Sequence, residues 1–395
     1  MNCSLQFPPP PRLMHDCGER ICSFGAGPSK MPTAVLQSLA SRICPSSPQE
    51  LSILEQSHRS PQFAAVLEEC RSTLRLLLAI PPDYEIGFMA GGATLLFSAL
   101  PLAFSSELCT PKAAYICSGL WSTKAQQEAH DLGVQVHSIS SNEIDTVASL
   151  CPNECAYLWM CVNETVNGVE FQSPELESIL SSVPSGIPVI CDASSSLLSR
   201  AFPVHKFGVV FGGVQKNIGP AGVAVVIVQK ALLAQWSCMP RPTKKIPSML
   251  DLVKCFKHNS LLNTPPTFSI YGVQEQLKWL IQEFGGSIEA IEASNKRKAE
   301  GLYAAIDGSG GFYRGAEAVE VKRRSRMNVV WGLRDAGLEK VFLEEAGAQG
   351  LVQLAGHRDV GGLRASLYNA VREWDVERLV RFMRSFQAKW ERGRE

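Results

Sequence analysis

The sequence predicts an α/β protein in which a large domain holds a mostly parallel sheet and a smaller C-terminal domain is also α/β. Short apolar runs alternate with helical patterns from about residue 61 to residue 284. The pattern changes near Phe284-Gly285-Gly286. Strands that alternate with helices favour a parallel sheet covered on both faces, and such sheets bind ligands at the carboxyl ends of their strands.

The elements of the large domain follow from hydrophobic spacing. Between residues 61 and 80, apolar side chains recur at intervals of three, four and seven, so we expect an amphipathic helix. A second helix is expected over residues 122–132. Strands are expected at the β-rich runs 114–117, 134–139, 157–161, 189–191, 209–211 and 223–228.

The C-terminal part is expected to hold a long polar helix through Glu300, strands at residues 328–331 and 362–367, and a closing helix. One apolar side marks the closing helix, formed by Val371, Trp374, Leu379, Phe382, Met383 and Phe386. We therefore predict a large domain over residues 23–282, with its first residues packed on a small domain over residues 283–395. Residues 1–22 contain a proline run and are expected to be a poorly ordered leader.

The composition excludes several classes of protein. The 395 residues are 45% hydrophobic and 19% charged, as in globular rather than disordered chains. Lys+Arg and Asp+Glu both number 38, so the net charge of zero argues against a nucleic-acid partner. No apolar run approaches the roughly 20 residues of a bilayer span, so we expect no membrane partner. The 13 cysteines lack zinc-type spacing, which predicts no metal site and reduced thiols in a cytoplasmic protein.

Lys216 lies in a glycine-rich turn between two strand candidates, within the segment GVVFGGVQKNIGPAGVAVVIV of residues 208–228. A loop lysine is usually only solvent-exposed. Here the surrounding glycines let backbone and ligand approach closely, which an ordinary surface turn does not need. An amine flanked by apolar strands can lose its proton and attack a carbonyl, so Lys216 is a candidate Schiff-base residue.

Asp192 ends the apolar run 187–191 and is followed by Ala193 and three serines. An aspartate before a serine most often caps the following turn. At the carboxyl end of a strand, however, a carboxylate also lies where α/β sheets bind ligands. Together with Lys216, it favours pyridoxal phosphate as cofactor, because a carboxylate beside the pyridine nitrogen keeps that nitrogen protonated and the ring able to accept electrons.

Two further segments give weaker signals. Gly91-Gly92-Ala93-Thr94 follows a strand candidate at residues 86–89 and precedes an apolar helix start, where free backbone N–H groups bind phosphate. A plain turn is the default interpretation of two glycines. Trp121 follows a strand end, from which an indole can stack on a planar ring, although core packing is the common role of a single tryptophan.

Basic residues recur at three places: His58-Arg59, His357-Arg358 and Arg364, the last among glycines. Local positive charge in a net-neutral chain suits a small polyanion. Each pair alone is usually solvated surface, so the hypothesis depends on their converging in space.

Taken together, these segments resemble the phosphoserine aminotransferases, which are class-V, fold-type I enzymes that use pyridoxal phosphate. The matching motifs stand in the family's order and cover nearly all of the chain from Cys22 onward. They are FGAGPSKMP (24–32), SHRS (57–60), GFMAGGATLLFSALPLAF (87–104), SGLWS (118–122), NETVNGVEF (163–171), CDASSSLLSR (191–200), GGVQKNIGPAG (212–222), NTPPTFSIY (263–271), RSRMNV (324–329) and GHRDVGGLRASLYNA (356–370). The resemblance implies a seven-stranded, mostly parallel sheet in the large domain.

The resemblance also implies the residues that hold the cofactor. Lys216 would bind pyridoxal phosphate as a Schiff base, Asp192 would bond the pyridine nitrogen, and Thr165 the phenolic oxygen. Trp121 would stack on the ring. The cofactor phosphate would be held by Ala93, Thr94, Ser194 and Gln215, and by Asn263 and Thr264 of a neighbouring subunit, so that a homodimer shares its active sites.

The implied reaction is ping-pong transfer of the amino group from L-glutamate to 3-phosphohydroxypyruvate, in L-serine biosynthesis. Glutamate would displace Lys216, and the freed amine would move a proton from the substrate Cα. Arg364 would bind the α-carboxylate. The distal anion would meet His357, Arg358 and, from the partner subunit, His58 and Arg59, because both substrates carry a second anion a few bonds away. Formation of 4-phosphohydroxy-L-threonine in pyridoxine biosynthesis is left open.

Three features depart from the family pattern. The leader before Cys22 matches nothing in the family, the position of Thr94 varies, and Val329-Val330-Trp331 replaces a strand often written with proline. The N–H of Thr94 is therefore a firmer expectation than its side chain. The assignments of Lys216 and Asp192 are untouched.

Two alternatives stay open from the sequence. Another class-V enzyme, such as a cysteine desulfurase or an alanine:glyoxylate aminotransferase, would use the same cofactor. A desulfurase needs an exposed cysteine in its C-terminal part, whereas the last cysteine here is Cys255, and a small-substrate aminotransferase does not need two His-Arg pairs. A non-catalytic scaffold with the same fold would have no use for Lys216.

Overall fold

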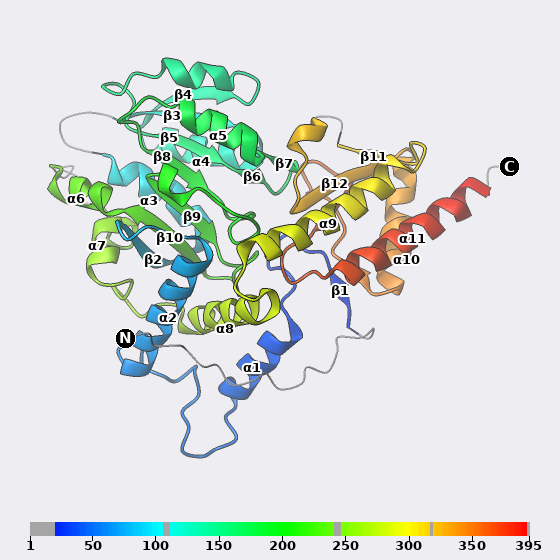
Figure 1. Cartoon of the computed structure of the whole chain (residues 1–395), viewed down its shortest axis with the longest axis horizontal. Helices are drawn as coiled ribbons and strands as arrows, with labels where there is room; N and C mark the ends of the chain where they lie inside the picture. The colour runs from blue at the N-terminus through cyan, green and yellow to red at the C-terminus, as the bar shows by residue number, and fades with distance from the viewer. Residues whose placement is uncertain (1–19, 106–110, 241–245, 317–318, 393–395) are drawn as a thin grey trace.

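The computed structural model describes residues 20–105, 111–240, 246–316 and 319–392. A large part is built on a seven-stranded sheet and a small part on a three-stranded sheet, seen at the left and the right of Figure 1. Most of the expected leader, residues 1–19, lies outside the described residues. The division into domains at residues 22/23 and 282/283 stays a prediction.

The sequence correctly predicts a mostly parallel sheet of seven strands. In spatial order the strands are β2 (Tyr84–Ala90), β10 (Val223–Gln229), β9 (Val209–Gly213), β8 (Val189–Asp192), β5 (Leu158–Cys161), β3 (Lys112–Cys117) and β4 (Gln135–Ser140). β10 runs antiparallel to β2 and β9, and the other neighbouring pairs are parallel. The carboxyl ends of β3, β5, β8 and β9 therefore meet at one edge of the sheet.

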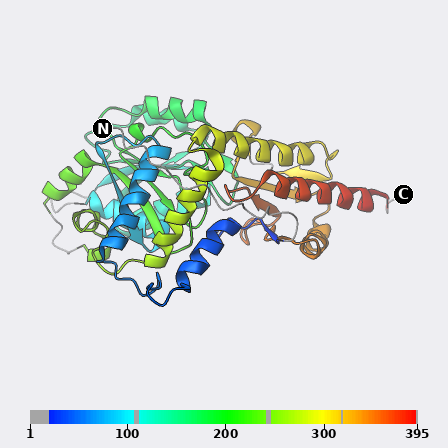
Figure 2. The same cartoon turned by 60° about the horizontal axis from the view of Figure 1, so that its bottom comes forward.

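Helices cover both faces of this sheet (Figure 2). One layer consists of α1 (Thr33–Ile43), α2 (Pro61–Leu77), α5 (Ser173–Ser182) and α8 (Thr267–Phe284). The other consists of α3 (Gly92–Ala103), α4 (Leu120–Asp131), α6 (Lys230–Cys238) and α7 (Leu252–Lys257). Along β10, Val225 and Ile227 pack into the first layer and Val226 and Val228 into the second, which explains why the strand is apolar throughout.

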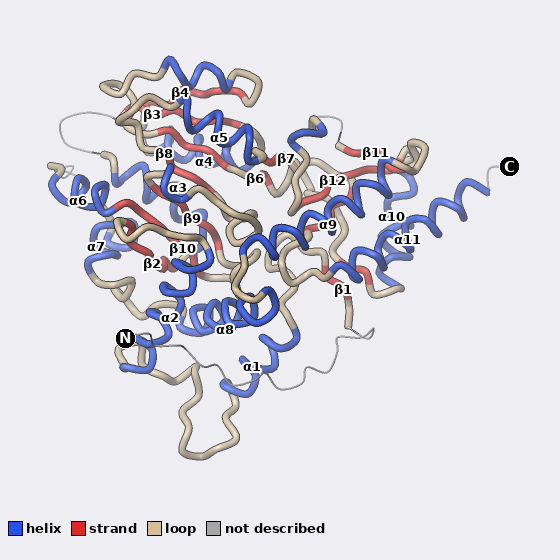
Figure 3. The backbone as a smooth tube through the Cα atoms, in the orientation of Figure 1, coloured by secondary structure: helices blue, strands red, loops and turns tan. Residues whose placement is uncertain are grey.

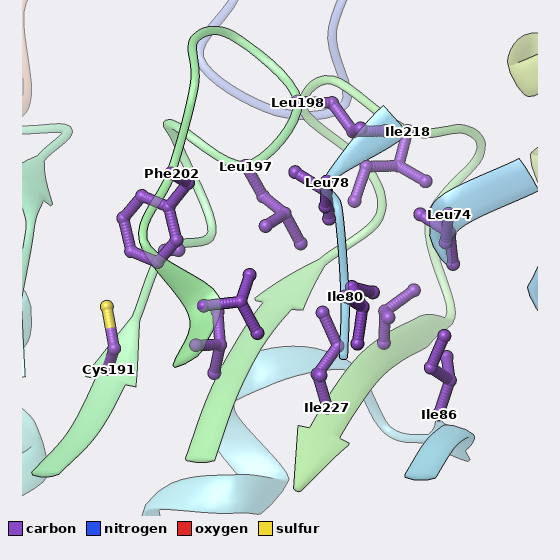
Figure 4. Close-up of a cluster of buried hydrophobic side chains, with 14 of the residues drawn as sticks. Leu74, Leu78, Ile80, Ile86, Cys191, Leu197, Leu198, Phe202, Ile218 and Ile227 are labelled. Carbon is purple, nitrogen blue, oxygen red and sulfur yellow. The ribbon is translucent and has the colours of Figure 1, made fainter. Parts of the chain in front are cut away.

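The core of the first layer joins the end of α2 to the sheet. Figure 4 shows Leu74 and Leu78 near Ile86 and Ile227, with Leu197 from the loop after β8 nearby. All five side chains are at most 3% exposed. Burying an aliphatic side chain of this size contributes roughly 1.5–3 kcal/mol, so this contact fixes the helix against the strands.

Two predicted helices differ from the structure at their ends. The helix expected over residues 61–80 ends at Leu77, because Ala79 has a left-handed backbone with φ of 47°. The helix expected over residues 122–132 begins two residues earlier, at Leu120, and ends at Asp131. Its early start depends on side chains from a distant segment, which are described below.

The small part is held by its own buried cluster of side chains. Figure 3 shows its strands in red with blue helices around them. Its antiparallel sheet has β11 (Tyr313–Gly315), β12 (Asn328–Leu333) and β14 (Leu363–Ser366), and its helices are α9 (Ile288–Asp307), α10 (Glu339–Ala348) and α11 (Glu373–Arg392). Near the N-terminus, β1 (Cys22–Ser23) pairs in parallel with β13 (Leu351–Val352), and Phe24 is buried in the same cluster.

The remaining short elements lie in connections. β6 (Asn163–Glu164) and β7 (Val169–Glu170) form a small antiparallel pair. Short 3₁₀ helices cover Ile144–Ser149, Val204–Lys206, Ser248–Leu250, Val321–Arg323 and Ala336–Leu338. Among the described residues, each helix is either too short or too polar to cross a bilayer.

Lys298 ties α9 to the segment that follows β14. Its Nζ donates to the carbonyl oxygens of Leu367, Tyr368 and Val371, at 2.9, 3.0 and 2.8 Å. The side chain is buried, and this burial lowers the pKa of Lys298 from 10.5 to about 7. The unfolded chain therefore binds a proton between pH 7 and 10.5 that the folded chain lacks.

The stability of the fold is expected to rise with pH because of Lys298. Compared with Lys298→Met, the wild-type free energy of unfolding should increase from pH 7 towards pH 10, by at most about 1.4 kcal/mol per pH unit, and be flat below pH 7. Urea denaturation at several pH values measures this. Lys296→Met, an exposed change on the same helix, should leave the pH dependence unaltered. A wild-type advantage that stays constant or falls above pH 7 would contradict the assignment.

Candidate active site

A cavity of about 450 Å³ lies where the carboxyl ends of the parallel strands meet. Its size is typical of a site for a small molecule or cofactor. Eight residues predicted from the sequence line it: Ala93, Thr94, Trp121, Thr165, Asp192, Ser194, Gln215 and Lys216. Segments far apart in the sequence thus place these eight predicted side chains around the same cavity.

Lys216 enters the cavity from the turn between β9 and β10. Its Nζ donates to Thr165 Oγ1 at 2.6 Å and lies 5.8 Å from the centroid of the Trp121 ring. The turn itself is pressed against α8, since a Cβ on Gly272 would lie 2.3 Å from Pro220 Cδ. Gly222 has a φ of 117°, which favours glycine. The amine is therefore held in place by the packing of its turn and by one hydrogen bond.

Asp192 is the last residue of β8 and is buried below the cavity. Burial raises the pKa of its carboxyl, while the positive charge of Lys216 and a hydrogen bond from Ser194 lower it. The backbone N–H of Ser194 donates to Asp192 Oδ1 at 2.9 Å. An acidic group in this position can bind a cationic ring nitrogen, because the attraction between the two charges is strong in the buried interior and offsets the cost of removing them from water.

The first turn of α3 forms another wall. Gly91 has a φ of 100° and its N–H donates to the carbonyl of Gly222, at 3.1 Å, which brings the turn beside the Lys216 loop. Ala93 and Thr94 lie in this first turn, where backbone N–H groups have no partner within the helix. Such a helix start binds phosphate.

Two polar atoms of the lining are buried without a hydrogen-bond partner among the described residues. They are Trp121 Nε1 and Gln215 Oε1. Leaving such atoms unpaired costs about 1–3 kcal/mol each, so a polar ligand in the cavity would gain by pairing with them. With an amine, a carboxyl and a helix start on its walls, the cavity can hold a planar cofactor that carries a phosphate.

Arg364 is outside the lining of this cavity but contacts Thr165, which is one of the lining residues. It is on β14, and its Nη1 donates to the carbonyl of Thr165 at 3.4 Å. Partial burial lowers the pKa of the guanidinium, which nevertheless stays charged at neutral pH. The small sheet thus brings one cation towards Lys216.

The structure does not bring the other predicted residues into the cavity lining: His58, Arg59, Asn263, Thr264, His357 and Arg358. Asn263 and Thr264 are exposed, as is Arg59. His357 lies with its Nδ1 3.4 Å from Asp359 Oδ2, and the side chain of Arg358 is 89% exposed. The two His-Arg pairs lie on separate loops of the chain, and their convergence across two subunits stays a prediction.

Sequence reasoning missed the buried polar residues that support the cavity. Asn163 lines it and donates to Ser195 Oγ at 2.7 Å and to Asn328 Oδ1 at 2.8 Å, while Asn328 donates to Ser366 Oγ at 3.0 Å. These bonds link the large sheet to β12 and β14, the strand of Arg364. The signal was the polar segment NETVNGVEF directly after an apolar strand, which sequence analysis used only to choose Thr165.

Comparison with known proteins gives consistent matches. The family model Aminotransferase class-V matches residues 21–379. A phosphoserine aminotransferase of Niallia circulans is 41% identical over 377 residues, covering 93% of this chain and 98% of its own. One of Bacillus subtilis (strain 168) is 40% identical over 375 residues, covering 93% of this chain and 99% of its own.

Solved structures agree. The phosphoserine aminotransferase from Bacillus circulans subsp. alkalophilus has a TM-score of 0.83 and 39% identity, covering 94% of this chain and 99% of that one. A PLP-bound phosphoserine aminotransferase from Trichomonas vaginalis has a TM-score of 0.80 and 34% identity, covering 92% of this chain and 100% of that one. The fold class predicted from the sequence is confirmed.

Proposed function

This chain belongs to the phosphoserine aminotransferase family of the class-V aminotransferases, and from that premise we propose that it makes O-phospho-L-serine for L-serine biosynthesis. The amino group comes from L-glutamate and passes to 3-phosphohydroxypyruvate, leaving 2-oxoglutarate. The observation that carries the proposal is the placing of Lys216 and Asp192 on one cavity with Trp121. The wider proposal that the chain also forms 4-phosphohydroxy-L-threonine has no separate support in the cavity.

Pyridoxal phosphate fits the lining residue by residue. Lys216 Nζ would bind its aldehyde, Asp192 its ring nitrogen and Thr165 Oγ1 its phenolic oxygen. Trp121 would cover the ring. The cofactor's phosphate would contact N–H groups at the start of α3 and the side chains of Ser194 and Gln215. A bridging water would link the phosphate to the unpartnered Gln215 Oε1, because two hydrogen-bond acceptors cannot bond directly.

The protein side chains divide the chemistry between them. When bound, pyridoxal phosphate supplies an electron sink and carries the amino group between the two half-reactions. Lys216 Nζ, once free, would take a proton from the substrate Cα and return it in the second half-reaction. The carboxylate of Asp192 would keep its cationic partner protonated. Trp121 and Phe97 would keep water away from that side of the cavity.

Arg364 is proposed to bind the α-carboxylate that both substrates carry. Its contact with the Thr165 carbonyl places the guanidinium next to the residue that holds Lys216. The distal carboxylate of glutamate and the phosphate of the ketoacid would be bound by a basic set comprising His357 and Arg358 with His58 and Arg59 of the partner subunit. One pocket can serve both substrates because each is an anion at both ends.

A homodimer with shared sites accounts for the predicted residues that lie outside the cavity. Asn263 and Thr264 are exposed and lie outside the lining of their own chain's cavity, which fits a role at the phosphate of a neighbouring subunit. The loop that carries His58 also exposes Leu51 and Leu54, at 61% and 56%. Exposed apolar side chains next to site residues are typical of an interface.

The other sequence-based alternatives receive less support. Family membership identifies an aminotransferase, which argues against a desulfurase and against a scaffold. An alanine–glyoxylate aminotransferase from Nostoc sp. shares the fold at 18% identity. We also propose a cytoplasmic location, which is supported by ten cysteines that are all free thiols in the described part of the chain.

Replacement of Lys216 by alanine is expected to stop catalysis, because no other amine would move the Cα proton. With pyridoxal phosphate present, stopped-flow absorbance should show no conversion on adding glutamate, and none on adding 3-phosphohydroxypyruvate to the aminated cofactor. Wild-type protein should complete both half-reactions. Half-reaction rates in Lys216→Ala within about tenfold of wild type would remove the lysine from the mechanism, since loss of a positioned acid–base group costs roughly 10²–10⁴-fold.

Replacement of Arg364 by alanine should weaken both substrates together. Loss of a charged hydrogen bond of about 1.5–3 kcal/mol predicts a rise in KM of roughly 10–100-fold for glutamate and for 3-phosphohydroxypyruvate alike. Steady-state kinetics of each substrate measures this. Arg314→Ala, at an exposed arginine of β11, serves as the matched control. If only one substrate loses affinity, a shared carboxylate site is wrong.

Mixed dimers test the shared site. Lys216→Ala subunits and Asn263→Asp/Thr264→Ala subunits should each be inactive as homodimers. In a heterodimer both defects should fall on one site if Asn263 acts across the interface, leaving the second site intact and active. If Asn263 serves its own chain, each site keeps one defect and the heterodimer stays inactive. Tandem affinity purification of differently tagged subunits isolates the heterodimer for the assay.

A further inference from the structure

The helix that carries Trp121 has no side chain at its N-cap position, and within the helix Ser122 Oγ accepts only from the N–H groups of Ser118 and Gly119, at 3.0 and 3.1 Å. The residue before α4 is Gly119, which has no side chain to accept from the helix N–H groups. The N–H of Leu120 instead donates to Asn167 Oδ1 at 3.1 Å, and the N–H of Trp121 donates to Glu164 Oε2 at 2.9 Å. The N–H of Ser122 donates to Glu164 Oε1 at 2.8 Å. Side chains from a distant segment thus accept hydrogen bonds from all three of these N–H groups in the first turn of the helix.

Gly119 leaves the room that this arrangement needs. A Cβ at position 119 would lie 2.6 Å from Glu164 Cγ and 2.8 Å from Asn167 Oδ1. Real Cβ atoms do not approach so closely, so a local cap such as serine at position 119 would displace both distant side chains. Glycine at position 119 is therefore required for Glu164 and Asn167 to reach the start of α4.

Glu164 is fully buried and faces the helix start as an acceptor. Burial raises the pKa of its carboxyl, hydrogen bonds from Ser122 and Trp121 lower it, and the nearby charge of Asp192 raises it. Ser122 Oγ adds a further bond to Glu164 Oε1, at 2.7 Å. The positive end of the helix dipole offsets part of the cost of burying this charge.

The next residue along the chain holds the other side of the cavity. Thr165 Oγ1 accepts from Lys216 Nζ at 2.6 Å, while Glu164 bonds the backbone of Trp121. The amine and the indole ring, 5.8 Å apart, are thus held by two adjacent residues, Glu164 at the end of β6 and Thr165 directly after it. Any movement of Glu164 would change the distance between them.

We propose that Glu164 is a positioning residue, whose carboxylate replaces the missing cap of α4 and thereby sets the Trp121 indole opposite Lys216. This inference rests on the proposed function, because the indole matters only if a planar cofactor lies beneath it. The same carboxylate occupies the N–H groups of α4. A phosphate would therefore bind at the start of α3, where Ala93 and Thr94 line the cavity, and not at the start of α4.

The test measures the position of Trp121 separately from catalysis. The full-length protein is labelled with 5-fluorotryptophan, and the fluorine NMR signal of Trp121 is assigned by its loss in Trp121→Phe. Glu164→Gln places amide N–H groups against the helix N–H groups, so this signal should shift and broaden in protein without added cofactor. With pyridoxal phosphate, kcat should fall roughly tenfold to a hundredfold, while KM for glutamate changes less than about threefold.

Two further variants separate positioning from stability. Glu164→Asp keeps the charge on a shorter side chain and should recover part of both the signal position and kcat. Ser287→Ala removes the cap of α9, where Ser287 Oγ accepts from the N–H of Ala290 at 3.1 Å, and should lower the melting temperature without moving the Trp121 signal or kcat.

The inference is overturned if Glu164→Gln behaves like Ser287→Ala, with a lower melting temperature but an unchanged Trp121 signal and kcat. If Glu164→Gln does not fold, Asn167→Ala and Glu164→Asp give the same two measurements, and an unmoved signal in both overturns it equally. Failure of the proposed function has a different result. Wild-type protein would then not transaminate at all, while the signal of Trp121 would still respond to Glu164.

Discussion

The hydrogen bond from Lys216 Nζ to Thr165 Oγ1 joins the end of one strand to the segment after another, and the site is built around it. It forms because β5 and β9 run parallel in one sheet and end at the same edge. It also needs the turn of Lys216 to press on α8, where Gly272 leaves room for Pro220. A shift of either strand by one residue would turn its side chains to the opposite face and remove the contact.

A second constraint is that charged groups are buried around the cavity, both at strand ends and at the start of a helix. Asp192 gains from the cation of Lys216, and Glu164 gains from the start of α4, so each acid has a specific partner. Buried charges of this kind are costly without such partners. The polar network of Asn163 and Asn328 then connects this centre to the strand of Arg364.

The sequence predicts the fold and the centre of the site because their signals are local. Most strands of the large sheet are apolar runs; Asp192 directly follows one and Lys216 lies in the turn between two, so the arrangement of the sheet brings them together. Glu164 and Lys298 could not be predicted in this way, because their partners lie 42 or more residues away along the chain. The His-Arg pairs lie on loops and, in the proposed homodimer, would come from two subunits, so no spacing within one chain encodes their placement.

The most direct test of this account is to find the lysine that bonds the cofactor. Protein loaded with pyridoxal phosphate would be reduced with borohydride and digested, and the peptides analysed by mass spectrometry. We predict one pyridoxyl phosphate group, on the peptide that contains Lys216. Label on another lysine, such as the buried Lys298, with Lys216 unmodified, would contradict the account.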